Sequence, residues 1–451
     1  MFLKYSIADI HRQFIDGYLD PIGLAEECVA KVSRLNPEFK AWVKFDSELL
    51  IQRAREANSR LATKKQLRVL EGIPIGVKDV FNTVEFATEM GSEIWKGFTP
   101  GNDARVIYYL KNAGALVAGK TVTAEFAVHA LNETLNPHNI NVTPGTSSSG
   151  SAVAVSLGMV PVALGTQTGA SIIRPASFCG VYGYKPSFGL IPRTGSLKTT
   201  DSLDTVGFFV ANPKDLKRVF DALRVHGPNF PISHRILNDQ SRQTKSANRP
   251  WNVGIVKTHT FSKAPPYAQR SLLDFADKLD KVVGIKVTEL ILPPEFERAH
   301  EIHAAIYDKS VSYYFAEEFV HSPRLSPIMR KMIDSGNEIT VDTFHRSLQL
   351  QEDLIQSMDS IMKNFDACIC LSTAGEAPKR NVMETQDSSL MWTLLHLPSM
   401  NIPLFHSPSG LPFGLQLFAR KYNDYLIFNI VDYLIENNLI PLGPNPLLQL
   451  E

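Results

Sequence analysis

The chain has 451 residues, of which 44% are hydrophobic and 20% are charged, and its 46 basic residues balance 46 acidic ones. This composition is typical of a globular protein and excludes disorder, collagen-like structure and coiled coil for the bulk of the chain. A formal net charge of zero gives no overall field that would attract nucleic acid or an anionic membrane, so neither is an expected partner.

The spacing of apolar residues predicts helices and strands in alternation along the chain. In chain order, the expected elements are helix 6–18, helix 22–35, strand 41–45, helix 48–65, strand 73–81, helix 103–113, strand 115–121, strand 251–256, helix 266–282, strand 284–292, long helices within 296–320 and 342–363, strand 365–371, strand 411–420 and helix 423–436. The polar stretch 225–250 is expected to be a long surface loop. Such alternation indicates an α/β sheet with parallel strand pairs.

Cysteine usage and the N-terminus favour a cytoplasmic protein. Four cysteines, Cys28, Cys179, Cys368 and Cys370, are too few for a disulfide scaffold and suit a reducing compartment. A metal site at the last two would need further ligands, and none lies nearby in the sequence. The N-terminus lacks the apolar core of a signal peptide, and no run of 18 apolar residues occurs. We therefore expect a cytoplasmic protein that does not associate with membranes.

A serine-rich loop, TPGTSSSGSAVAV (143–155), precedes a helix of small residues. A phosphate-binding loop would need a lysine after Gly150, and none follows it. A flexible surface turn does not fit the apolar flanks, which place the loop beside a core. The remaining interpretation is catalytic, with serine hydroxyls presented to a pocket by a strained turn.

A second serine, Ser171, follows the small residues Thr168, Gly169 and Ala170. A turn of such residues can bring backbone N–H groups together on one point, as an oxyanion hole requires. The alternative is a tight strand–helix turn in which Ser171 is only the N-cap.

A serine nucleophile needs a base, and the twelve histidines stand in no recognisable hydrolase motif. Lys78 is the candidate because it lies among apolar residues in IPIGVKD, where burial would lower its pKa and favour the neutral amine. The alternatives are a side chain that reaches solvent and an ion pair with Asp79.

Together these segments resemble the amidase signature family of serine hydrolases. The family's three motifs are matched by GIPIGVKD (72–79), GTSSSGS (145–151) and GTQTGASIIRP (165–175). Residues 178–195 and 201–209 match two further family segments. The resemblance assigns Lys78 as the catalytic base, Ser147 as the bridging serine and Ser171 as the nucleophile. It also implies an oxyanion hole formed by the backbone of Thr168, Gly169, Ala170 and Ser171, with no metal and no cofactor.

The chain departs from the family pattern at four positions, where Gln167, Ala170, Thr146 and Ser149 replace an aspartate and three glycines. The resemblance also implies that the Thr146–Ser147 peptide bond is cis.

The resemblance implies one large α/β/α domain over 1–451, with a mixed, twisted sheet of about ten or eleven strands flanked by helices. Its expected parts are N-terminal helices (1–65), a catalytic core (66–225), a variable region that covers the substrate (226–350) and a C-terminal completion of the sheet (351–451).

Substrate contacts are predicted for Arg174, Gln167 and Ser148. Arg174 comes three residues after Ser171, so on a helix both would share a face, where the guanidinium could bind a substrate carboxylate. The alternative for Arg174 is a structural ion pair. His300 and His303 are spaced like metal ligands on a helix, but the favoured interpretation is two histidines on the surface or on the core side of a helix that bind no metal.

Three functions remain open. The main prediction is a serine amidase that acts on a small carboxamide and releases ammonia or an amine. The alternative is the amidase component of an aminoacyl-tRNA amidotransferase complex, which would use the same residues on glutamine and need a partner protein. A binding protein that has lost catalysis is the third. A homodimer is common in such families, and no residue here indicates one.

Overall fold

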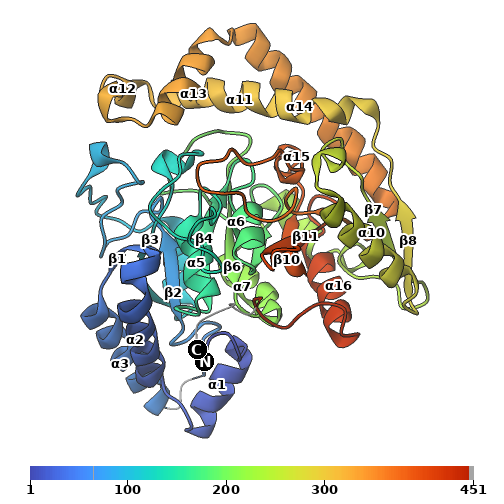
Figure 1. Cartoon of the computed structure of the whole chain (residues 1–451). Helices are drawn as coiled ribbons and strands as arrows, with labels where there is room; N and C mark the ends of the chain where they lie inside the picture. Colours follow the sequence, from blue (N-terminus) through green and yellow to red (C-terminus); the bar gives the residue numbers. More distant parts are fainter. Residues whose placement is uncertain (64–65, 446–451) are drawn as a thin grey trace.

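Eleven strands join into one mixed sheet that helices flank (Figure 1). This computed structural model describes residues 1–63 and 66–445. The strands are β1 (Trp42–Phe45), β2 (Pro74–Lys78), β3 (Leu116–Thr121), β4 (Val162–Gln167), β5 (Tyr182–Lys185), β6 (Thr205–Val210), β7 (Trp251–Ile255), β8 (Ile285–Glu289), β9 (Ala367–Leu371), β10 (Ser399–His406) and β11 (Pro412–Phe418). The helices are α1 (Ile7–Asp16), α2 (Pro21–Phe39), α3 (Ser47–Ala62), α4 (Arg105–Asn112), α5 (Ser149–Ser156), α6 (Ile173–Phe178), α7 (Leu216–Leu223), α8 (Pro231–Leu237), α9 (Gln240–Gln243), α10 (Pro266–Asp280), α11 (Ala299–Tyr314), α12 (Ala316–Phe319), α13 (Pro327–Glu338), α14 (Val341–Ile361), α15 (Ser389–Leu394) and α16 (Asp424–Glu436).

The order of strands across the sheet brings the motifs together. That order is β1-β3-β2-β4-β6-β5-β10-β11-β9-β7-β8. Strand β2 lies between β3 and β4 and runs parallel to both. Parallel strands end at the same edge of a sheet. Since Val77 is in register with Leu164, Lys78 at the end of β2 comes level with the last residues of β4.

The predicted α/β fold with a sheet of ten or eleven strands is confirmed, as are most predicted elements. The N-terminal helices begin as capping rules require: Ser6 forms a capping box with Asp9, and Asp20 caps the helix that starts at Pro21. The predicted helix 48–65 is α3, which ends at Ala62, and the last two residues of that prediction lie outside the described residues.

Several elements were not predicted, and some predicted segments differ from the structure. Strands β4, β5, β6 and β10 were not predicted, because glycine and threonine interrupt the apolar pattern of β4 to β6 and a proline interrupts β10. The surface loop expected at 225–250 contains α8 and α9. The helix expected over 296–320 ends at Tyr314, a short α12 follows, and α13 was not predicted.

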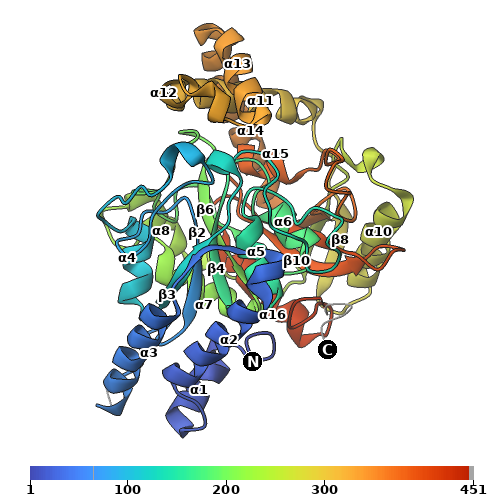
Figure 2. The same ribbon diagram turned by 60° about the vertical axis from the view of Figure 1, so that its left-hand side comes forward.

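A layer of helices lies over one end of the sheet. In both views α11, α13 and α14 lie together at the top, with α15 between this layer and the sheet (Figures 1 and 2). A separate cluster of buried apolar side chains lies beneath it, including Phe126, Phe315 and Trp392. The segment 226–350 also supplies β7 and β8 to the sheet.

Three lysines, Lys78, Lys120 and Lys185, are completely buried in the sheet region. A buried ammonium is costly unless it is paired or loses its proton, so each of these side chains needs a structural or chemical explanation. Across residues 1–63 and 66–445, no helix has both the length and the apolar character needed to cross a membrane.

Candidate active site

Lys78 is the last residue of β2, and its side chain enters a buried polar cluster. Its Nζ donates to Ser147 Oγ at 2.7 Å and to Thr166 Oγ1 at 2.8 Å. Burial holds the pKa of Lys78 well below its ordinary value, and the negative charge of Asp204 opposes this shift. The same burial that makes the ammonium costly therefore favours a neutral amine in contact with a serine hydroxyl. Asp79 does not pair with Lys78: it forms an ion pair at 2.8 Å with Lys120.

Backbone contacts hold the serine loop in place. The Thr146–Ser147 peptide bond is cis, and Ser147 O accepts a hydrogen bond from Ala124 N at 3.1 Å. Gly150 N donates to Val122 O, and a Cβ at Gly150 would lie 2.3 Å from Ala41 O. Only glycine fits this close approach of two backbones.

Ser148 and Ser151 fasten this loop to β4. Ser148 Oγ donates to Thr166 O at 3.2 Å, and Ser151 Oγ donates to Leu164 O at 2.7 Å. Both side chains are fully buried. The structure therefore gives Ser148 a structural partner in place of the predicted substrate contact, because its hydroxyl proton is used by the strand backbone.

The segment Thr168–Ser171, which we call the 168–171 turn, connects β4 to α6. In the described part of the chain, the amides of Gly169, Ala170 and Ser171 donate to no other protein group. Ala170 is not among the described residues with positive φ, so the alanine that replaces the family's glycine causes no backbone strain. Three neighbouring N–H groups without a protein partner are the arrangement that can bind an oxyanion.

Ser171 lies in this turn, with 6% of its surface exposed. The serine loop packs against the residues that follow it: a Cβ at Gly145 would lie 2.9 Å from Pro175 Cα. Within the described residues, no hydrogen bond joins the hydroxyls of Ser171 and Ser147. Catalytic hydrogen bonds are often long in a free enzyme and shorten when substrate binds.

Gln167 and Arg174 both have protein partners, contrary to the predicted substrate contacts. Gln167 Oε1 accepts from Ile172 N at 2.8 Å and Ile173 N at 3.0 Å, so this amide braces the start of α6. Arg174 pairs with Asp387 at 2.9 Å and also with Glu384. The ion-pair alternative therefore describes Arg174, and its charge is already balanced by two carboxylates.

The two histidines of α11 have different roles. His300 Nδ1 lies 3.0 Å from His259 Nε2, whereas His303 Nε2 lies 2.8 Å from the carbonyl oxygen of Thr168. They do not act as a chelating pair. His303 is 2% exposed, and burial lowers its pKa to about 3, so the ring is neutral at physiological pH.

Thr166 and Asp204 were not predicted as members of this site. Asp204 accepts hydrogen bonds from Thr168 Oγ1 at 2.7 Å and from Thr199 N at 2.8 Å. It thereby holds the side chain of Thr168, the first residue of the 168–171 turn. Thr166 stands one residue before Gln167 in the third motif, and Asp204 ends the DSLD run at 201–204. The side chain of Thr166 is placed by the strand β4, and since β4 was not predicted, the sequence pattern gave no signal for Thr166.

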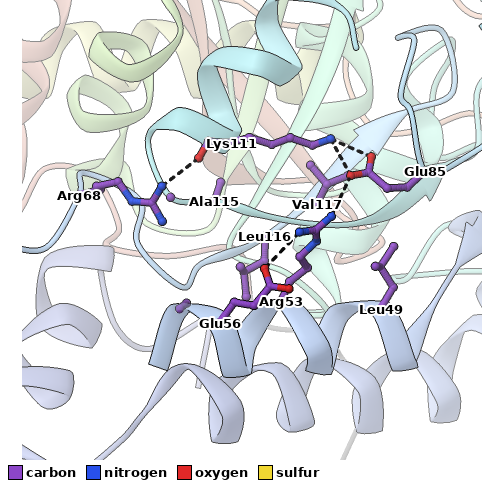
Figure 3. A pocket seen from close by; sticks show the side chains of 11 residues that line it. Leu49, Arg53, Glu56, Arg68, Glu85, Lys111, Ala115, Leu116 and Val117 are labelled. Carbon is purple, nitrogen blue, oxygen red and sulfur yellow. Dashed lines mark hydrogen bonds and ion pairs between the residues drawn. The ribbon is translucent and has the colours of Figure 1, made fainter. Parts of the chain in front are cut away.

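A cavity of about 310 Å³ lies elsewhere, between α3 and β3 (Figure 3). Its charged residues pair with one another: Lys111 binds Glu85 at 2.7 Å, and Arg53 binds Glu56 at 3.1 Å. None of the residues that line this cavity belongs to the serine–lysine cluster at the end of β2 and β4.

Known proteins resemble this chain in fold and in sequence. The family model described as Amidase matches residues 23–428. A glutamyl-tRNA(Gln) amidotransferase subunit of Endomicrobium trichonymphae is 28% identical over 471 residues, which cover 95% of this chain and 96% of that protein. The peptide amidase of Stenotrophomonas maltophilia superposes with a TM-score of 0.81 at 23% identity, covering 98% of both chains. A vestigial protein complex linked to the origins of an s-triazine catabolic enzyme contains a chain with a TM-score of 0.86 at 23% identity, which covers 97% of this chain and 100% of that one.

The eleven-stranded sheet, the cluster of Lys78 with Ser147 and the match to the family model together define an enzyme that hydrolyses amides. The chain belongs to the amidase family, the amidase signature enzymes.

Proposed function

We propose that this enzyme is a serine amidase that cleaves the C–N bond of a carboxamide through an acyl-enzyme on Ser171. The observation that carries the proposal is the 2.7 Å contact of Lys78 Nζ with Ser147 Oγ, in a chain whose 168–171 turn has three amides without a protein partner among the described residues. A buried amine held neutral is a base, and unpartnered amides are donors for a developing negative charge.

In the proposed reaction, Ser171 Oγ attacks the carbonyl carbon and passes its proton through Ser147 Oγ to Lys78 Nζ. The amides of the 168–171 turn stabilise the oxyanion, and loss of one such donor typically costs about 3–4 kcal/mol of barrier. Ser147 then protonates the leaving nitrogen with the proton held by Lys78, and the C–N bond breaks. Water attacks the ester through the same relay, releases the carboxylic acid and restores Ser171 and the neutral lysine.

The proposal is tested by intact mass after treatment with a fluorophosphonate probe. We expect one adduct on the wild type and none on Ser171→Ala, because only an activated hydroxyl attacks phosphorus at a useful rate. Ser177→Ala is the matched control, since Ser177 is a buried serine of α6 whose hydroxyl binds Thr373 at 2.8 Å. Failure of the folded wild type to react would contradict the proposal.

A second candidate is the amidase component of an aminoacyl-tRNA amidotransferase, acting on glutamine and supplying ammonia to a partner protein. The similarity over nearly the whole length of an amidotransferase component favours it. Against glutamine stands Arg174, the cation predicted to bind a substrate carboxylate, because Glu384 and Asp387 already balance it.

Ammonia release separates the two candidates. The purified chain should hydrolyse small uncharged carboxamides if it acts alone. Under the second candidate it should release ammonia from glutamine only together with a co-purifying partner, and simple amides should be poor substrates.

A further inference from the structure

Two of the carbonyl groups of the 168–171 turn, those of Thr168 and Gly169, are each held by a side chain from outside the three motifs. His303 of α11 binds Thr168 O at 2.8 Å, and Thr393 Oγ1 of α15 donates to Gly169 O at 2.6 Å. Because a carbonyl oxygen only accepts, Nε2 of His303 must carry the hydrogen. Helix α15 lies between the α11–α14 layer and the sheet (Figure 1).

These donors determine where the amides of the turn point. The carbonyl of Thr168 and the amide of Gly169 belong to one planar peptide unit, and in a trans unit the two groups point in opposite directions. The carbonyl of Gly169 and the amide of Ala170 form the next unit. A donor on each carbonyl therefore directs an N–H away from α11 and α15, and it also polarises that N–H through the peptide group.

Gln167 fixes the direction of the Thr393 hydroxyl. Gln167 Nε2 donates to Thr393 Oγ1 at 2.9 Å, so the single hydroxyl proton of Thr393 is free to point at an acceptor, and Gly169 O at 2.6 Å is closer than Ser389 O of the same helix at 3.4 Å. Aspartate, which the family pattern has at position 167, has no N–H with which to make this contact. The glutamine that replaces the family's aspartate at position 167 therefore has a hydrogen-bond acceptor in the hydroxyl of Thr393.

From this geometry we infer that Thr393, oriented by Gln167, and His303 are positioning residues that align the amides of Gly169 and Ala170 with the oxyanion. The inference rests on the proposed function. It also assigns part of the catalytic geometry to α11 and α15, outside the serine–lysine motifs.

The test is the inactivation of Ser171 by a fluorophosphonate, whose phosphoryl oxygen takes the place of the oxyanion, with kinact and KI measured separately. Thr393→Val keeps the shape and removes the hydroxyl; we expect kinact to fall about tenfold to hundredfold, less than for loss of a direct donor, with KI unchanged. Thr393→Ser should restore kinact. His303→Phe should lower kinact similarly, and His303→Gln, which retains a donor at the same depth, should recover part of it.

Ser310→Ala is the matched control, because it removes a buried hydroxyl from α11 that binds Ile306 O within its own helix. An unchanged kinact for folded Thr393→Val, an equal loss in Thr393→Ser, or a change in KI alone would overturn the inference. If Thr393→Val does not fold, Gln167→Glu is the deciding variant. It keeps the oxygen that accepts from Ile172 and Ile173 but removes the N–H that donates to Thr393. An unchanged kinact in folded Gln167→Glu would also overturn the inference. A wild type that does not react would instead refute the proposed function.

Discussion

The variant Lys120→Met tests how the buried charge of Asp79, the residue next to the proposed base Lys78, is stabilised. Lys120 is fully buried in β3, and its Nζ binds Asp79 at 2.8 Å, Phe81 O at 2.9 Å and Thr88 Oγ1 at 2.9 Å. Burial raises the pKa of Asp79, and the charge of Lys120 opposes this shift. Methionine preserves most of the volume but leaves the carboxylate of Asp79 without its cation.

The expected loss of unfolding free energy follows from these contacts. Removing one partner of a buried ion pair costs about 3–5 kcal/mol, because the remaining charge stays buried without compensation. Thr88 Oγ1, which loses its donor, adds about 1 kcal/mol where water does not replace the lysine, whereas Phe81 O keeps its hydrogen bond from Thr88 Oγ1. Since domains are stable by about 5–15 kcal/mol, Lys120→Met should remove a large fraction of the stability.

Urea unfolding followed by tryptophan fluorescence measures this change at pH 7. The double variant with Asp79→Asn should recover most of the loss, because the amide is neutral and its oxygen still accepts from Glu89 N. Lys44→Met, on an exposed position of the neighbouring β1, is the surface control. A loss below about 1 kcal/mol for Lys120→Met, or no recovery in the double variant, would refute the view that the ion pair offsets a buried charge.

Three further outcomes are expected. Lys78→Met should slow fluorophosphonate labelling about 10²–10⁴-fold without unfolding the protein, and the wild-type labelling rate should fall as pH falls through the lowered pKa of Lys78; a rate independent of pH would contradict this. His303 stays neutral in the fold to about pH 3 but binds a proton near pH 6.5 when unfolded, so stability should fall from about pH 6.5 down to pH 3, with about 2 kcal/mol lost by pH 5; urea titrations of His303→Phe should show a smaller pH slope than those of the wild type. Gly150→Ala should displace the serine loop and abolish labelling, whereas Gly23→Ala in α2, where a Cβ has at least 3.5 Å of space, should leave labelling unchanged.

Local patterns predicted the elements whose side chains repeat regularly. The helices α1 and α2 have clear caps and apolar faces, so their sequences sufficed. Strands β5 and β6 were missed because glycines stand among their apolar residues, and only their neighbours in the sheet select the extended conformation.

The candidate site divides in the same way. Lys78, Ser147 and Ser171 stand in motifs with fixed spacing, so the sequence could identify them. Their supporting groups come from afar: Asp387 is 213 residues from Arg174, and His303 is 135 residues from Thr168. A single sequence contains no signal for such pairs, so the partners of Arg174 and Gln167 could be found only from the fold.

The position of β10 and β11 has a consequence for synthesis on the ribosome. This hairpin, made from residues 399–418, lies between β5 and β9 and thereby joins the two halves of the sheet. During translation β5 and β9 each present an open strand edge until residues 399–418 emerge, and open edges are sites of aggregation. The segment that contains the proposed nucleophile, Ser171, is therefore made well before the hairpin that joins the two halves of its sheet.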